Sequence, residues 1–238
     1  MDTGHVKQVA SFEKLLGFCN AQGAMFNPSK AALQPAALSA LLTSAQDSIK
    51  AVQTVRNAYS LAKNLRNDAF DSLPRFMTRI VNVLAASEVT QATMDDAYAI
   101  VRKFRRSSSR KAVPAVEGES SPATRSVSQL DFDSQLNNFE AMVKLVSTQP
   151  TFQPNEVDLT VAALQGKAVE LRTLNATVVS NQVALSNARA ARNQLLYAKP
   201  GIHGLAMATK RYVKGAFGTQ SVAYGQIRGI KFINLKPE

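Results

Sequence analysis

Apolar residues recur at intervals of three and four along most of the chain, a spacing that predicts amphipathic helices. The first such run covers residues 5–22, and a longer one follows Pro35 for over thirty residues without an internal glycine or proline. At about 1.5 Å per residue, this second helix is expected to be roughly 50 Å long. Two shorter helices are predicted at 76–86 and 87–104, with Ser87 as the N-cap of the latter.

The same plan returns in the second half of the chain. The tetrapeptide "FNPS" at 26–29 reappears as "FQPN" at 152–155, and a constant offset of 126 then aligns 36–67 with 162–193, where nine of 32 positions are identical. Four further helices are predicted at 132–146, 155–197, 205–216 and 221–232. We therefore expect an all-α protein made of two tandem four-helix units, produced by an internal duplication and each containing one long helix.

Composition changes between the two copies. Residues 107–130 are rich in Ser, Pro and Ala, carry mixed charge and show no apolar periodicity, which is typical of a linker. The expected organisation is a helical repeat unit over 1–106, a flexible linker over 107–130 and a second helical repeat unit over 131–238.

The end of the second copy departs from the first. Six of the 11 glycines lie in the last 38 residues, and each glycine costs a helix about 1 kcal/mol. A helix over 221–232 therefore rests on the analogy with the first copy, and a strand-like or irregular tail is the alternative. Because Gly225 and Gly229 lie four residues apart and permit close backbone approach, we expect this element in an inter-copy or inter-chain contact.

Composition narrows the class of protein. Hydrophobic residues make up 45% and charged residues 19%, as in folded globular chains, and no apolar run is long enough to span a bilayer. The N-terminus lacks the pattern of a secretory signal, so a cytoplasmic protein is expected. One cysteine, Cys19, and two histidines exclude an internal disulfide and a Cys/His zinc site. We expect no cofactor.

The formal net charge of +11 is compatible with an anionic partner. Residues 1–106 and residues 131–238 each have an excess of 5 positive charges, so neither half of the sequence is more basic than the other. One dense cluster is a candidate for contacting phosphates: Arg102, Lys103, Arg105, Arg106, Arg110 and Lys111. The alternative is that these cations oppose the negative end of a helix dipole and then enter a solvated linker.

No set of residues predicts catalysis. Asp95 and Asp96 are adjacent on a helix and point about 100° apart, so they do not converge on one substrate. Asp131 and Asp133 are expected to cap the first helix of the second copy, and His203 lies in a predicted turn without a triad partner. Two aligned pairs, Arg66-Asn67 and Arg192-Asn193, are interpreted as structural rather than as a duplicated ligand site.

The motifs "FNPS" with the following "AAL" run, "ALSNARAARNQLLY" and "KRYVKGAFGTQSVAYGQIRGIKF" are similar to those of a family of duplicated helical proteins abundant in Bacteroidota. The resemblance covers nearly the whole chain. It implies the helical duplication and a bacterial origin, and it implies no activity, cofactor or site residue.

The leading hypothesis is a non-enzymatic structural or protein-interaction protein that associates with itself or with a protein partner. The alternative is a basic protein that binds the phosphate backbone of nucleic acid without sequence preference. An enzyme with an unrecognised site ranks third. A continuous basic surface would favour nucleic acid, whereas an exposed apolar groove would favour a protein partner.

Overall fold

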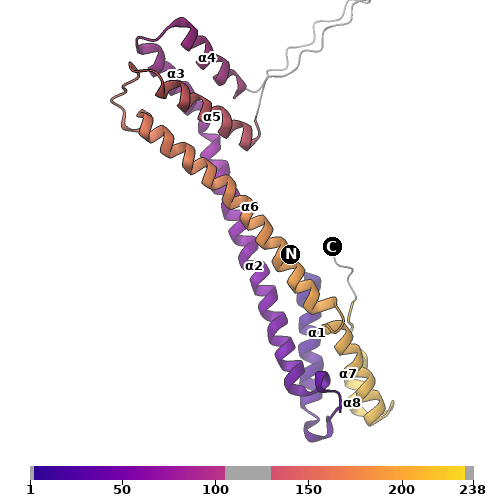
Figure 1. Cartoon of the computed structure of the whole chain (residues 1–238). Coiled ribbons are helices and arrows are strands. Elements are labelled where there is room, and N and C mark those ends of the chain that lie inside the picture. The colour runs from indigo at the N-terminus through magenta and orange to yellow at the C-terminus, as the bar shows by residue number, and fades with distance from the viewer. Residues whose placement is uncertain (1–2, 105–129, 234–238) are drawn as a thin grey trace, which may run out of the picture. The chain divides into compact units, whose positions relative to one another are not determined.

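The computed structural model describes residues 3–104 and 130–233 (Figure 1). These residues form helices and connecting turns, and no strand occurs among them. The helices are α1 (Thr3–Asn20), α2 (Pro35–Asp71), α3 (Leu73–Ala86), α4 (Gln91–Lys103), α5 (Phe132–Ser147), α6 (Val161–Tyr197), α7 (Ile202–Phe217) and α8 (Val222–Arg228). The all-α prediction is therefore confirmed for this part of the chain.

Local chemistry accounts for most helix ends. Pro74 lies in the first turn of α3, where the missing N–H costs nothing. Asp131 caps α5 as predicted, because its side chain accepts a hydrogen bond from the backbone N–H of Ser134 at 2.8 Å. Ser87 was wrongly predicted to cap α4. The N-cap is Thr90, whose hydroxyl accepts from Thr93 N–H at 3.3 Å, whereas Ser87 is the C-cap of α3 and its hydroxyl donates to the carbonyl of Val83 in that helix.

Both long helices contain 37 residues. At 1.5 Å per residue each is about 55 Å long, close to the expected length. The helix predicted from residue 155 begins at Val161, because a 3-10 turn at Val157–Leu159 precedes it and the Thr160 hydroxyl accepts from the N–H of Ala163 at 3.3 Å. A similar 3-10 turn, Ala31–Leu33, precedes α2.

The helices form two compact units. One, which we call the terminal unit, combines Met1–Tyr59 with Asn181–Glu238, and the other, the central unit, is Ser60–Ser180. This grouping differs from the expected units at 1–106 and 131–238. Each long helix contributes one part to each unit, so a unit takes helices from both halves of the sequence.

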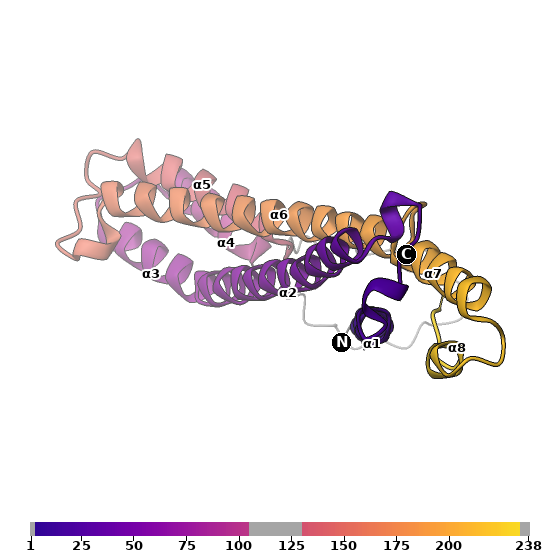
Figure 2. The same ribbon diagram turned by 90° about the horizontal axis from the view of Figure 1, so that it is seen from below.

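The terminal unit is built around α1, whose apolar face packs against α7 and α8 (Figure 2). Parts of α2 and α6 complete its core. The buried side chains include Phe12, Leu15, Cys19, Leu38, Leu196, Ile202, Ala206 and Ile227. The first helix of the sequence is thus covered by the last two.

The central unit has its own core, in which α4 packs against both α3 and α5. The first part of α6 and the last part of α2 contribute the remaining apolar surface. Its buried side chains include Phe70, Met77, Leu84, Val101, Phe139, Met142, Leu164 and Leu171.

Many apolar positions that the sequence repeat aligns are buried in both copies. Phe12 and Phe139, which align in the first helix of each copy, are 1% and 0% exposed, and Leu38 and Leu164 on the long helices match them. The pairs buried in both copies include Phe12 and Phe139, Cys19 and Val146, Phe26 and Phe152, Leu33 and Leu159, Leu38 and Leu164, and Val52 and Val178.

The C-terminal element is helical but shorter than predicted. Helix α8 covers Val222–Arg228 and ends at Gly229, and 230–233 continue without regular structure. Gly225 and Gly229 are exposed, and a Cβ atom built on either would meet no atom within 4 Å. Within the described residues these glycines therefore do not serve a close contact between helices.

Candidate functional site

The positive charge is distributed unequally between the two units. The terminal unit, Met1–Tyr59 with Asn181–Glu238, has 14 Lys and Arg against 4 Asp and Glu, a net charge of +10. The central unit has 14 against 13, a net charge of +1. The sequence halves conceal this difference because each unit combines segments from both halves.

Helix α7 carries the densest cations of the terminal unit. Its buried face includes Ala206 and Val213, whereas Arg211 and Lys214 are exposed and Lys210 is half-buried. No carboxylate in the sequence between Glu170 and Glu238 offsets these charges.

Helix α8 and the residues after it add two more exposed cations, Arg228 and Lys231. Lys210 holds this segment against α7, because its Nζ donates to the carbonyl oxygens of Arg228, at 3.2 Å, and of Ile230. Burial lowers the pKa of Lys210. Lys210 therefore fixes the segment, while four cations face solvent. We call them, with their supporting helices, the α7–α8 surface: Arg211, Lys214, Arg228 and Lys231.

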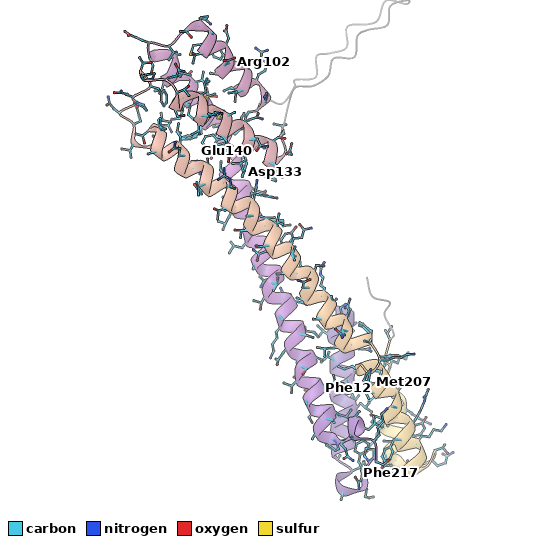
Figure 3. The ribbon with its side chains drawn as sticks, viewed as in Figure 1. Phe12, Arg102, Asp133, Glu140, Met207 and Phe217 are labelled. Carbon is cyan, nitrogen blue, oxygen red and sulfur yellow. The ribbon has the colours of Figure 1, made fainter. Side chains whose placement is uncertain are left out.

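Aromatic rings lie among these cations. The Nζ of Lys214 is 6.0 Å from the ring centroid of Tyr224, and the Nζ of Lys210 is 5.6 Å from that of Phe232. Phe217 ends α7 (Figure 3) and is half-buried, as are the other two rings. Tyr212 differs, because its ring packs edge-on against Phe26 with centroids 5.4 Å apart.

The structure describes two of the six cations that the sequence analysis selected. Arg102 and Lys103 lie in the last turn of α4, in the central unit (Figure 3), and the other four, Arg105, Arg106, Arg110 and Lys111, lie outside the described residues. The same helix carries the exposed carboxylates of Asp95 and Asp96. Arg102 and Lys103 therefore share their helix with negative charges.

A groove lies between α4 and α5, next to Lys103. Its volume is about 460 Å³, with an apolar floor that includes Ile100 and Leu145 and a rim that bears Asp96, Lys103 and Lys144. The groove therefore combines apolar side chains with charged groups of both signs.

The candidate catalytic residues are dispersed. Asp133 was predicted to cap α5, and this prediction is wrong. Its carboxylate instead accepts a hydrogen bond at 3.0 Å from the Nδ2 of Asn175, which lies on α6. His203 lies in the first turn of α7 rather than in a turn between helices. Cys19 is buried in the core of the terminal unit. Among the described residues, no group of three His, Cys, Asp or Glu side chains could hold a metal ion.

The aligned Arg-Asn pairs make structural contacts, as the sequence analysis interpreted them, but the contacts differ. The guanidinium of Arg66 lies over the Phe132 ring, 3.8 Å from its centroid. Arg192 is buried, and its Nε and one terminal nitrogen donate to Asn193 Oδ1 at 3.2 and 2.9 Å.

A comparison of whole sequence halves does not reveal the cations of the α7–α8 surface, because both halves carry the same net charge. Two signals were present. No Asp or Glu occurs between Glu170 and Glu238, and the segment "KRYVKGAF" with "AYGQIRGIKF" alternates cations with aromatic residues. That second pattern is typical of surfaces that contact nucleic acid.

No family model, curated protein or solved structure matches the chain. Over residues 3–104 and 130–233, no helix combines the length and the hydropathy needed to cross a membrane. The interpretation of the surface therefore depends on its own residues.

Proposed function

We propose that this protein is a non-enzymatic, nucleic-acid-associated helical protein that binds the phosphate backbone through its terminal unit, without sequence preference. The observation that carries the proposal is the concentration of a net charge of +10 in that unit. Lys and Arg side chains that neutralise phosphates release condensed counterions, and this release drives association. Contacts to the phosphate backbone carry no direct sequence information, so sequence specificity is not expected of a surface built on cations.

Two features favour binding over catalysis. The titratable groups that a reaction would need are separated, with Cys19 buried in the terminal core and Asp95, Asp96 and Asp133 exposed in the central unit. The exposed cations, in contrast, lie together on α7 and α8. A surface of this kind supplies affinity and steering without chemistry.

The test is a salt titration of binding to a fluorescein-labelled nucleic acid, measured by anisotropy. A variant neutralises the α7–α8 surface by changing Arg211, Lys214, Arg228 and Lys231 to Gln. Its matched control removes the same number of charges from the central unit by changing Arg75, Arg102, Lys103 and Lys144 to Gln. We expect wild-type affinity to fall by at least about 100-fold between about 50 and 200 mM salt.

The two variants should differ in affinity and in slope. Neutralising the α7–α8 surface should lower the salt slope by up to about 0.9 for each phosphate that is no longer neutralised, whereas the control should bind nearly as the wild type does. A third variant neutralises Arg105, Arg106, Arg110 and Lys111. Equal losses of affinity in the first two variants, or a loss only in the third, would contradict the assignment to the terminal unit.

A second candidate function is self-association, which is supported by exposed apolar side chains on the two long helices. Leu61 and Leu65 on α2 and Val169 and Val179 on α6 are 49 to 59% exposed, all within the central unit. A second copy of the chain could cover these side chains. Light scattering of the wild type and of Val179→Glu checks this: a strict monomer in both cases over micromolar concentrations would exclude it.

We infer in addition that the chain arose by tandem duplication of a four-helix segment. The shared burial of aligned residues such as Phe12 with Phe139 and Leu38 with Leu164 supports this inference. Duplication also supplies matched positions in the two units, which serve as internal controls for the experiments below.

A further inference from the structure

We infer that the α7–α8 surface binds single-stranded nucleic acid in preference to duplex, by stacking unpaired bases on Phe217, Tyr224 and Phe232. This inference rests on the proposed function and specifies its ligand. Base stacking on aromatic side chains needs an unpaired, accessible base, whereas cations alone bind either form.

The first observation is the partial exposure of the three rings. Each packs against the terminal core on one side and is half-buried, although core aromatics of the same unit, such as Phe12 and Phe26, are at most 3% exposed. Each ring thus keeps part of its surface in solvent. A lysine Nζ lies over the rings of Tyr224 and Phe232, at 6.0 and 5.6 Å from their centroids, so a stacked base would share or displace that position.

The second observation is a contrast between the aligned ends of the two copies. The dipeptide Lys103-Phe104 ends α4, and Lys231-Phe232 follows α8. Phe104 is 4% exposed in the core of the central unit, whereas Phe232 is half-buried. The second copy therefore places at its surface a ring that the first copy uses for packing.

The third observation is that Phe232 is held in place from both sides. Lys210 Nζ binds the carbonyl oxygen of Ile230, two residues before the ring. The backbone N–H of Ile233, directly after the ring, donates to the buried side chain of Gln8 at 3.1 Å. A ring fixed in this way loses little conformational entropy when a base stacks on it.

Tyr224 is positioned by the start of α8. Its backbone N–H donates to the Ser221 hydroxyl at 3.1 Å, which caps the helix. The next residue, Gly225, is exposed and has no neighbouring atom within 4 Å of a built Cβ, and the same holds for Gly229 beside Arg228. The backbone beside the Tyr224 ring and beside Arg228 is thus open to a ligand. Glycine, which has no side chain, permits this approach at both Gly225 and Gly229.

Electrostatics place a phosphate chain along the same rings. Lys214 lies beside Tyr224, and Arg228 and Lys231 flank the segment that leads to Phe232. Successive bases can then stack while the phosphates between them contact cations, as in other single-strand surfaces. A duplex can use the cations but not the rings.

The experiment compares two fluorescein-labelled probes on the full chain, an oligothymidylate of about 20 nucleotides and a mixed-sequence duplex of about 20 base pairs, a length that exceeds a typical single-strand site. We expect the oligothymidylate to bind roughly tenfold tighter or more. The variants are Tyr224→Leu and Phe232→Leu, and the matched control is Tyr98→Leu, an exposed tyrosine on α4 of the central unit that stands in the same "AY" dipeptide.

Each variant of the surface should lose about five- to tenfold in affinity for the oligothymidylate and almost none for the duplex, with an unchanged salt slope. Tyr224→Phe keeps the ring and should bind as the wild type does. Tyr98→Leu should change neither affinity. Thermal unfolding of every variant separates a loss of stacking from a loss of structure, because misfolding would lower both affinities together.

A direct readout is available because the chain contains no Trp. In Phe232→Trp the indole is the sole Trp fluorophore, and its emission should be quenched by the oligothymidylate but not by the duplex. Equal affinity for both probes, with no effect of the Leu variants and no quenching, would overturn the stacking inference and leave the proposed function standing. Binding to neither probe at about 50 mM salt, including the case in which anionic phospholipid vesicles bind instead, would overturn both.

Discussion

At the scale of single residues, capping groups decide where helices begin. Thr90 and Ser87 are both hydroxyl residues near the start of α4, and either could cap it. Only Thr90 does so, because it directly precedes the first helical residue, Gln91, whereas Ser87 is the C-cap of α3 and its hydroxyl donates to the Val83 carbonyl at 3.0 Å. The choice between two chemically similar residues thus depends on where the preceding helix ends.

Removing the cap should therefore have a position-specific cost. Thr90→Ala should lower the free energy of unfolding by about 1 kcal/mol, because the N–H of Thr93 loses its acceptor. Ser87→Ala removes a back-bond within α3 and should cost less. Urea unfolding of the two variants checks the order, and a larger loss of stability for Ser87→Ala would contradict the assignment of the cap.

The single cysteine provides a probe of opening in the terminal unit. Burial raises the pKa of Cys19 to about 11, and the thiol is buried in the core. At pH 8 almost no thiolate is present, so we expect iodoacetamide to label the native protein far more slowly than the unfolded chain. The labelling rate should rise with pH towards 11 and with denaturant, and rapid labelling of the native protein at pH 8 would contradict the buried position.

At the scale of elements, periodicity predicted the helices well because it records burial along one face. The helices of the first copy occur where the apolar spacing placed them, within a few residues. The larger errors are in boundaries: α4 starts after Thr90 and not at Ser87, a 3-10 turn delays the start of α6, and α8 already ends at Gly229. Local turns and glycines compete with a pattern that specifies faces but not boundaries.

The buried faces of the long helices can be tested individually. Leu38 and Leu164 are 1% and 0% exposed, so replacing either by Ala should cost about 2–5 kcal/mol of unfolding free energy. Leu65→Ala is the control, because its side chain is 49% exposed and should cost less than about 1 kcal/mol. Urea or thermal unfolding followed by circular dichroism measures all three, and equal melting of the three variants would show that the faces are misassigned.

At the scale of the whole molecule, the packing partners of each helix decide the charge of each unit. Helix α1 packs against α7 and α8, which come from the other half of the sequence. The terminal unit consequently gathers the acid-free C-terminal segment with the N-terminal segment, while the central unit holds most carboxylates. The anionic partner proposed above follows from this grouping and not from the total charge.

The grouping predicts how the two halves of the chain behave when separated. A fragment of residues 1–106 lacks the α7 and α8 residues that bury Phe12 and Leu15, and a fragment of residues 131–238 lacks α1, α3 and α4. Each fragment alone should show reduced helicity and no cooperative transition, and mixing should restore both. Cooperative unfolding of an isolated monomeric 1–106 fragment, followed by circular dichroism, would contradict the composite units.

The sequence by itself determined the helices, the residues on their buried faces and the aligned positions of the two copies, because these depend on contacts three and four residues apart. Only the tertiary structure decided which helices cover one another. An apolar stripe specifies that a face is buried but carries little information about its partner, since most apolar side chains pack with similar energy. The charge of a surface depends on that choice of partners, which is why two halves with equal charge form one basic unit and one nearly neutral unit.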